Sequence, residues 1–283
     1  FVNPIIDIQY FLNGTDSNGC SNIDSIGITI DVLPAITISN DTAICIGDTI
    51  NISANGGVSY EWLNLDFINN TTISNPNIWP NASSTYPVKV TGGNNCFDTA
   101  EINITVNPLP TIFAGNEQNI CFGDSTFLIA SGSANSYSWD NGVLDGVSFQ
   151  VNQTLDYILT GIDLNSCINS DTVTINSLDL PTIDAGSAQT ICFGDSAQII
   201  ASGGTTYLWT PNINITDNTI ENPFVFPSTD TNYFVIGTDT NGCQNNDSVS
   251  ISINSLPTIV ISNDTSICIG DTISINASGG IQY

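Results

Sequence analysis

The 283-residue chain contains no histidine and no methionine, and Lys89 is its one basic residue. With 27 acidic residues, its formal net charge is -26. Proteins that bind nucleic acid or anionic membranes need clustered Lys or Arg, so this composition excludes both kinds of partner. Because methionine is absent, Phe1 is not a translation start, and we expect a processed chain or a segment of a longer one.

The missing histidine and arginine also argue against catalysis. A Ser or Cys nucleophile would lack its usual base. Paired carboxylates could still hydrolyse a glycan, but enzymes are not normally built as tandem copies of one short sequence. We therefore expect no enzyme.

Long apolar runs and helical periodicity are missing as well. No run approaches the ~18 residues of a membrane span, and no signal peptide is visible. The helix formers Glu, Lys and Leu are scarce, whereas 41% of the residues are hydrophobic and many alternate with polar ones. Alternation with a period of two is typical of strands with one buried face, so we predict an all-β protein.

One short motif recurs along the chain. The sequence Ile-Cys-x-Gly-Asp, followed by Ser or Thr, begins at Ile44, Ile120, Ile191 and Ile267. Each copy follows a proline, and these prolines are 76, 71 and 76 residues apart. A fixed period indicates a tandem array. We predict three whole repeats and a partial one at each end, with the boundaries 1–33, 34–109, 110–180, 181–256 and 257–283.

Each repeat reads as a small β-sandwich. Ile50, Ile52 and Ala54 alternate with polar residues after the motif, and a Tyr-x-Trp strand follows. About seven strands, with a core Trp on the third and a Tyr opening the sixth, are typical of a Greek-key sandwich. The predicted fold is a tandem array of Greek-key immunoglobulin-like β-sandwich domains, end to end. We expect core positions for Trp62, Trp139, Trp209 and, in one repeat, Trp79.

The segments ICFGDSAQIIASGGTTYLW (191–209) and TNYFVIGTDTNGCQNNDSVSISI (231–253) carry a resemblance. They resemble tandem immunoglobulin-like and PKD-like repeats of very long secreted surface proteins of Bacteroidota-type bacteria, which are associated with gliding, adhesion and type IX secretion. The resemblance implies an extracellular stalk or filament of the adhesin type. Its partners would be neighbouring repeats of the same chain, lateral copies of itself, and surface glycans or proteins.

Eight cysteines stand at fixed places in the repeats. There is no CxxC pair and no histidine, so disulfides fit better than zinc and indicate an oxidising compartment. The first cysteine of a repeat lies in the Ile-Cys motif, and the second follows a turn rich in Asn and Gly. In chain order they are Cys20, Cys45, Cys96, Cys121, Cys167, Cys192, Cys243 and Cys268.

Three pairings are open. Bonds within a repeat (Cys45–Cys96, Cys121–Cys167, Cys192–Cys243) would join sites ~30 Å apart in a sandwich, although disulfide Cα atoms must come within ~7 Å. Bonds across the 25-residue step would need a hairpin at Asn107–Pro110. We favour bonds between neighbouring repeats, Cys45–Cys167 and Cys121–Cys243. Cys20 and Cys96 would then reach backward, and Cys192 and Cys268 forward, to repeats mostly outside this chain.

A second motif is Asp followed by Ser or Thr, which resembles the O-glycosylation acceptor of Bacteroidota. The candidate hydroxyls are Thr42, Thr49, Ser125, Ser196 and Thr272 near the second strand, and Ser25, Thr99, Thr172 and Ser248 in the last strand. The alternation of the strands points these hydroxyls outward. Ordinary turn chemistry also explains Gly-Asp-Ser/Thr before a strand, but it explains the last-strand copies less well.

Two weaker hypotheses concern ligands. The loops of Asp16 and Asp239 offer close-set oxygen atoms of the kind that calcium prefers, but tight-turn chemistry explains them better, and we expect no metal or cofactor. The segments Asn64–Asn81 and Asn212–Glu221 vary between repeats. As an alternative function, they could grip a glycan or a protein.

Overall fold

The computed structural model describes residues 1–282, and Tyr283, expected at the place of the strand tyrosine, lies outside them. The described residues form 26 strands and no helix. No membrane-spanning helix is therefore found in this part of the chain. Contacts divide the described residues into two compact units, the first made of Phe1–Gly115, Ile129–Asp145 and Ile158–Thr172, and the second of Asn116–Leu128, Gly146–Tyr157 and 173–282.

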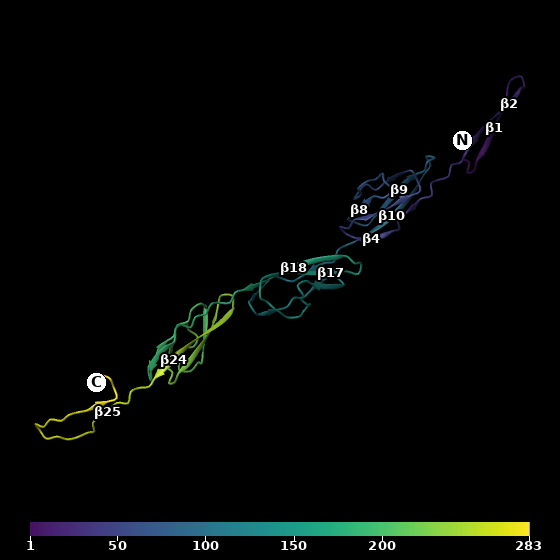
Figure 1. Ribbon diagram of the computed structural model, residues 1–283. Helices are drawn as coiled ribbons and strands as arrows, with labels where there is room; N and C mark the ends of the chain where they lie inside the picture. The colour runs from purple at the N-terminus through teal and green to yellow at the C-terminus, as the bar shows by residue number, and fades with distance from the viewer. Residues whose placement is uncertain (283) are drawn as a thin grey trace. The chain divides into compact units, whose positions relative to one another are not determined.

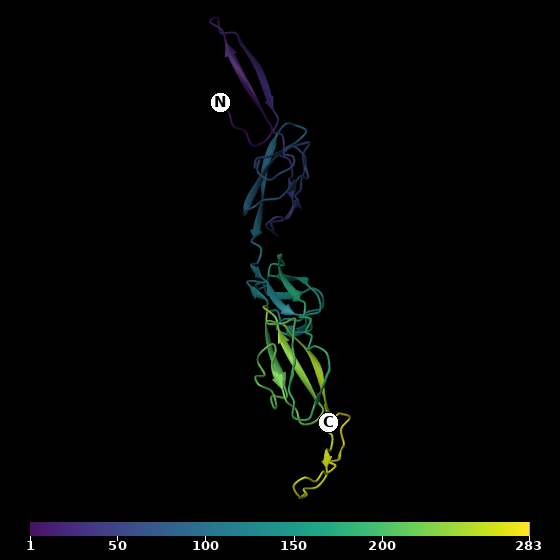
Figure 2. The same cartoon turned by 90° about the vertical axis from the view of Figure 1, so that its left-hand side faces the viewer.

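The first unit begins with a hairpin of β1 (Ile8–Thr15) and β2 (Ser21–Ile28), whose strands are antiparallel. Figure 1 labels both strands, and Figure 2 shows them in purple from another side. Ile26 of β2 is 64% exposed, whereas its counterpart Ile102 in the next repeat is 0% exposed. The difference arises because the described residues place no second sheet over this hairpin.

Residues 34–109 form a complete sandwich in the first unit. One sheet has the order β4-β10-β9-β7, in which β4 runs parallel to β10 and the other pairs are antiparallel. The opposite layer pairs β3 with β6 and β5 with β8. The bounds are β3 (Thr37–Ile38), β4 (Thr42–Cys45), β5 (Ile50–Asn51), β6 (Ala54–Asn55), β7 (Ser59–Trp62), β8 (Asn77–Ile78), β9 (Ser84–Thr91) and β10 (Phe97–Asn107).

Alternation explains how this sandwich buries its core. On β9 the side chains of Tyr86, Val88 and Val90 are fully buried, while the residues between them are not. The opposite layer contributes Ile52 and Ile78 to the same cluster. Burial of such side chains contributes ~1.5–3 kcal/mol each, so the core is what holds the two layers together.

The same strands return in residues 110–180 and 181–256. The four-stranded sheets have the orders β12-β18-β17-β15 and β19-β24-β23-β21, and the short pairs are β11–β14, β13–β16 and β20–β22. In each sheet the first strand is parallel to the last strand of the repeat. The bounds are β11 (Ile112–Phe113), β12 (Gln118–Cys121), β13 (Ser125–Thr126), β14 (Ser131–Gly132), β15 (Ser136–Trp139), β16 (Phe149–Gln150), β17 (Leu155–Ile162), β18 (Ile168–Leu178), β19 (Gln189–Cys192), β20 (Ala197–Gln198), β21 (Thr206–Thr210), β22 (Phe224–Val225), β23 (Thr231–Thr238) and β24 (Gln244–Asn254). Beyond these, β25 (Val260–Ile261) pairs with β26 (Ala277–Ser278).

The tryptophans follow the core prediction in part. Trp62 and Trp209 are fully buried, and each donates its indole N–H to a backbone oxygen, of Ile73 at 2.9 Å and of Ile220 at 3.0 Å. Trp139 is only partly buried. For Trp79 the prediction is wrong, since its side chain is 41% exposed and Ile78 fills the core instead. Because successive strand residues face opposite ways, a shift of one residue turned Trp79 outward.

A glycine between β20 and β21 gives a test of this fold. Gly203 has φ +89°, and a Cβ there would overlap the backbone oxygen of Thr182. Gly194 has φ +94° with open space around its Cβ position. We expect Gly194→Ala to destabilise by ~1–2 kcal/mol, the cost of the left-handed conformation, and Gly203→Ala by ~1–3 kcal/mol more from the clash. Urea unfolding compares the two, and equal losses would contradict the close packing at Gly203.

Candidate functional site: two disulfide junctions

Two disulfides join residues that lie far apart in the sequence. Cys45 is bonded to Cys167 and Cys121 to Cys243, with a Cα–Cα distance of 5.5 Å in each bond. Both bonds have a sequence separation of 122. They connect the first cysteine of one repeat to the second cysteine of the next, which is the pairing that the sequence favours. A cysteine bonded in this way is not available for a bond within its repeat or across the 25-residue step.

The first half of each junction is a tight turn. The Asp48 N–H donates to the Cys45 carbonyl oxygen at 3.0 Å, and the Asp48 carboxylate accepts the Cys45 N–H at 3.0 Å. Gly47 has φ +93°, a value that side chains rarely adopt and a type II turn requires. The Asp124 N–H closes the same turn on the Cys121 oxygen at 3.0 Å. Gly-Asp is therefore turn chemistry at both sites.

The parallel strand before this turn carries the cysteine to the end of its repeat. In the register of β4 and β10, Cys45 lies opposite Asn107. The Ile46 N–H donates to the Asn107 carbonyl oxygen at 2.9 Å. Asn107 is the last residue of β10, so Cys45 stands where the chain leaves the repeat.

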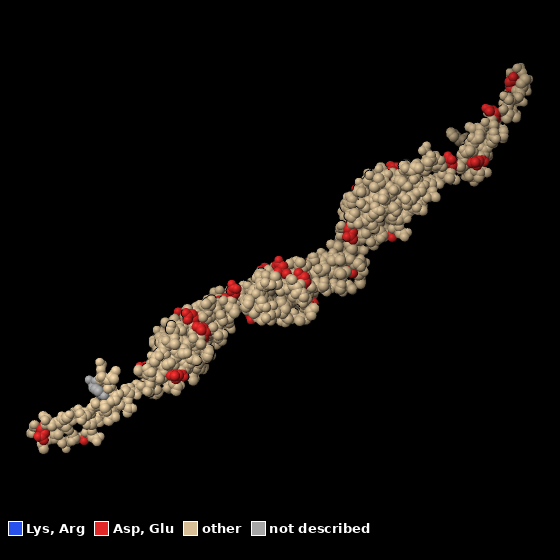
Figure 3. All heavy atoms as spheres, viewed as in Figure 1, with Lys and Arg blue, Asp and Glu red and all other residues tan. Residues whose placement is uncertain are grey.

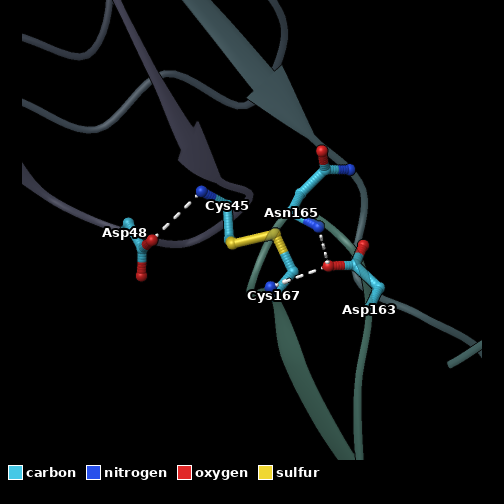
Figure 4. The surroundings of a disulfide bond; sticks show 5 residues. All are labelled: Cys45, Asp48, Asp163, Asn165 and Cys167. Atoms are coloured by element: carbon cyan, nitrogen blue, oxygen red, sulfur yellow. Dashed lines mark hydrogen bonds between the residues drawn. A yellow bond between two sulfur atoms is a disulfide. The ribbon is translucent and has the colours of Figure 1, made fainter. Parts of the chain in front are cut away.

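The second half is the hairpin before the last strand of the following repeat. One carboxylate oxygen of Asp163 accepts the N–H groups of Asn165 and Cys167, each at 2.8 Å. Ser166 has φ +65°, the left-handed position of a three-residue hairpin loop. Figure 4 shows this hairpin and the turn of Asp48 on the two sides of the bond. Cys167 is fully buried, so the junction is shielded from solvent on the hairpin side.

Two other hairpins repeat this arrangement. Asp239 accepts the N–H groups of Asn241 and Cys243 at 2.8 and 2.9 Å, and Cys243 is buried. Asp16 accepts the N–H of Cys20 at 2.9 Å. The calcium candidates Asp16 and Asp239 thus both serve as hydrogen-bond acceptors of their own loops. Within residues 1–282, no group of three or more His, Cys, Asp or Glu side chains is placed to hold a metal ion.

Polar side chains of the last strand fix the start of the same repeat. Asn169 donates from Nδ2 to the backbone oxygen of Pro110 at 2.9 Å, and Asp171 accepts the Ala114 N–H at 2.9 Å. The third whole repeat has the same pair of bonds, from Asn245 to Pro181 at 3.0 Å and from Ala185 to Asp247 at 2.8 Å. Sequence reasoning missed this role, although these residues lie two and four places after the second cysteine in both repeats.

The carboxylate of Asp247 gives a prediction about pH. The N–H groups of Ala185 and Ser248 donate to it and lower its pKa below the ordinary 3.8. A lowered folded-state pKa adds stability that is present above pH 3.8 and is lost as pH falls through the folded value. We expect Asp247→Asn to lower the urea midpoint at pH 6, and the difference from the natural chain to shrink as pH falls below 3.8. Asp179→Asn, at an exposed position, controls for the loss of one charge, and a difference that does not shrink on acidification would contradict this role.

The candidate glycosylation hydroxyls lie mostly on the surface. Thr42 on β4 is half-buried, and the other candidates are exposed. The exposed ones are Ser25, Thr49, Thr99, Ser125, Thr172, Ser196, Ser248 and Thr272. The aspartates before Thr172 and Ser248 are the ones that hold Ala114 and Ala185, so part of the last-strand motif has a structural role.

The variable segments cover the core tryptophans. Ile73 lies in the segment Asn64–Asn81 and Ile220 in the segment Asn212–Glu221, and each accepts the indole N–H of the tryptophan in its repeat. Further bonds close these segments on themselves, such as Asn70 with Thr72 and Asp217 with Thr219. These contacts give both segments a place in the fold of their own repeat.

Four cysteines have no disulfide partner among residues 1–282: Cys20, Cys96, Cys192 and Cys268. Cys192 closes the same turn as the bonded cysteines, since the Asp195 N–H donates to its oxygen at 3.0 Å. Cys20 lies in a hairpin of the same kind as that of Cys167, since its N–H donates to the carboxylate of Asp16. That these four reach to further repeats stays a prediction.

Comparisons with known proteins find similar solved structures only. No family model matches the chain, and no curated protein matches it. An N-terminal fragment of Down Syndrome Cell Adhesion Molecule with eight Ig domains has 14% identity and a TM-score of 0.34, with 91% of this chain and 40% of that chain covered. A Ca2+-stabilized adhesin of an Antarctic bacterium that binds ice has 12% identity and a TM-score of 0.34, with 88% and 82% covered. The titin tandem I9-I11 has 10% identity and a TM-score of 0.32, with 78% and 100% covered. TM-scores of this size establish no relationship, and the fold assignment rests on the strand order.

Proposed function

We propose that this chain is a structural repeat region of an extracellular stalk, rod or filament of the adhesin type, stiffened by disulfides between neighbouring repeats. The observation that carries the proposal is the pair of bonds Cys45–Cys167 and Cys121–Cys243. A bond within a domain would stabilise that domain alone. A bond from the exit turn of one repeat to a hairpin of the next restrains the angle between them.

The linkers support the same role. Pro110 and Pro181 open their repeats, and proline restricts both its own backbone and that of the residue before it. The hydrogen bonds from Asn169 and Asn245 to these prolines hold each linker against the last strand. With little freedom at the linker and a covalent bond across it, the length of an array would scale with the number of repeats.

An extracellular place follows from the chemistry of the bonds and the surface. Disulfides persist in oxidising compartments. Acidic side chains are spread over the visible face without gathering in one patch (Figure 3). A high net charge of one sign keeps molecules soluble and apart, and with one basic residue the chain offers trypsin-type proteases almost no cleavage site.

Glycosylation is a further part of the proposal. The exposed hydroxyls after aspartate, such as Ser248 and Thr172, are accessible to a transferase, whereas Thr42 is half-buried in a strand. Glycopeptide mass spectrometry of the protein from its source should find sugar mass on the exposed sites and less on Thr42. Unmodified peptides at every site would end this part of the proposal and leave the structural role untouched.

The structural role is tested by the distribution of angles between neighbouring repeats in electron micrographs of single molecules. The oxidised protein should show a narrow distribution, and Cys45→Ser with Cys121→Ser a broader one. The matched control replaces Cys192 and Cys268, which stand in the same turns without a bond, and should behave as the oxidised protein does. Equal distributions in all three samples would refute stiffening by disulfides, and failure of antibodies to label intact source cells would refute the extracellular place.

A further inference from the structure

The two disulfides overlap along the chain. Cys121 lies inside the loop closed by Cys45–Cys167, and Cys167 lies inside the loop closed by Cys121–Cys243. The segment 121–167 therefore belongs to both loops. Two separate loops would each enclose a different segment of the chain, whereas these two loops both enclose the segment 121–167.

This overlap gives the chain a covalent path much shorter than its backbone. From Cys45 to Cys243 the backbone has 198 residue steps. The alternative path crosses from Cys45 to Cys167, runs backward through 46 steps to Cys121, and crosses to Cys243. It omits 152 steps.

We propose that the overlapping disulfides limit how far the chain extends under tension. Load entering at Cys45 crosses to Cys167, runs against the chain direction through 121–167, and leaves through Cys243. Residues 46–120 and 168–242 carry none of it. This inference rests on the proposed role as a stalk, rod or filament for its biological meaning, but the covalent path itself depends only on the two disulfides.

The shielded stretches hold most of two sandwiches. Residues 46–120 include β5 to β10, with the buried Trp62, and residues 168–242 include β19 to β23, with the buried Trp209. A fold that carries no tension is not unfolded by it. The stretch that yields is therefore 121–167, which holds β13 to β17 of the middle repeat, and its extension is bounded by the 46 steps between Cys121 and Cys167.

Force-extension measurement on single molecules tests this, with the chain held by peptide tags at its two ends and free thiols blocked beforehand. A fully extended chain spans ~3.3–3.6 Å per residue. Complete unfolding of the oxidised chain should therefore end ~500–550 Å short of the fully reduced chain, the length of the omitted 152 steps.

Single variants give the decisive comparison. Cys45→Ser leaves only the loop closed by Cys121–Cys243, with a separation of 122. When fully unfolded, this variant should therefore be only 30 steps, or ~100–110 Å, longer than the oxidised natural chain. Cys192→Ser should release nothing. If the bonds lay within repeats, both variants would release the same 51 steps each, and that result, or an oxidised chain as long as the reduced one, would overturn the proposal. If the oxidised chain were shorter than the reduced one under force, but micrographs showed a broad distribution of angles between repeats, only the stalk proposal would be refuted.

Discussion

Replacing Cys45 by serine is expected to lower the free energy of unfolding of the segment between Cys45 and Cys167 by up to ~5 kcal/mol. The bond closes a loop with a separation of 122 residues, and the entropy of the unfolded chain that such a loop removes corresponds to this value. Cys45 is half-buried, so the substitution itself loses little packing. A loss of this size is a large part of the stability of a small domain.

Urea unfolding under oxidising conditions, followed by tryptophan fluorescence, measures the effect. Cys192→Ser is the matched control, because Cys192 occupies the same turn and has no disulfide. It should leave the unfolding curve unchanged. In reductant the natural chain should unfold as easily as a variant that lacks both bonds. If Cys45→Ser and Cys192→Ser behaved alike, the bond to Cys167 would not exist in solution.

Truncation of Trp209 to alanine is expected to cost ~3–5 kcal/mol, as is usual for a large aromatic residue in a core. Its side chain is fully buried among Ile199, Tyr233 and Val249 in one cluster. The change also removes the donor for the Ile220 oxygen.

Trp79→Ala is the control for this substitution. Trp79 is 41% exposed, and a change at such a position should cost less than ~1 kcal/mol. Urea unfolding of both variants, each compared with the natural chain, gives the two losses. A large loss at Trp79 with a small one at Trp209 would mean that the strands of these repeats are shifted by one residue.

The all-β class follows from the sequence because alternation is a local pattern. Tyr86, Val88 and Val90 alternate with Pro87 and Lys89, and the structure buries only the first three. Trp79 shows where such reasoning fails. The strand β8 has only two residues. So short a strand does not show from the sequence which of its residues face the core and which face solvent.

The favoured pairing of Cys45 with Cys167 came from strand direction and reach rather than from any local motif. Sequence reasoning did not find the roles of Asp171 and Asp247, because their partners Ala114 and Ala185 are 57 and 62 residues away. Such contacts depend on the tertiary arrangement. The Asp-Ser/Thr motif shows the same limit, since its aspartate and its hydroxyl have different roles that the letters alone do not separate.

The central claim is that disulfides join each sandwich to the next, and a non-reducing peptide map measures this most directly. With one basic residue in the chain, trypsin is of little use, so cleavage before aspartate is the better choice. Mass spectrometry should find the Cys45 peptide linked to the Cys167 peptide, and the Cys121 peptide linked to the Cys243 peptide. Linkage of Cys45 to Cys96, or of Cys96 to Cys121, would contradict the account.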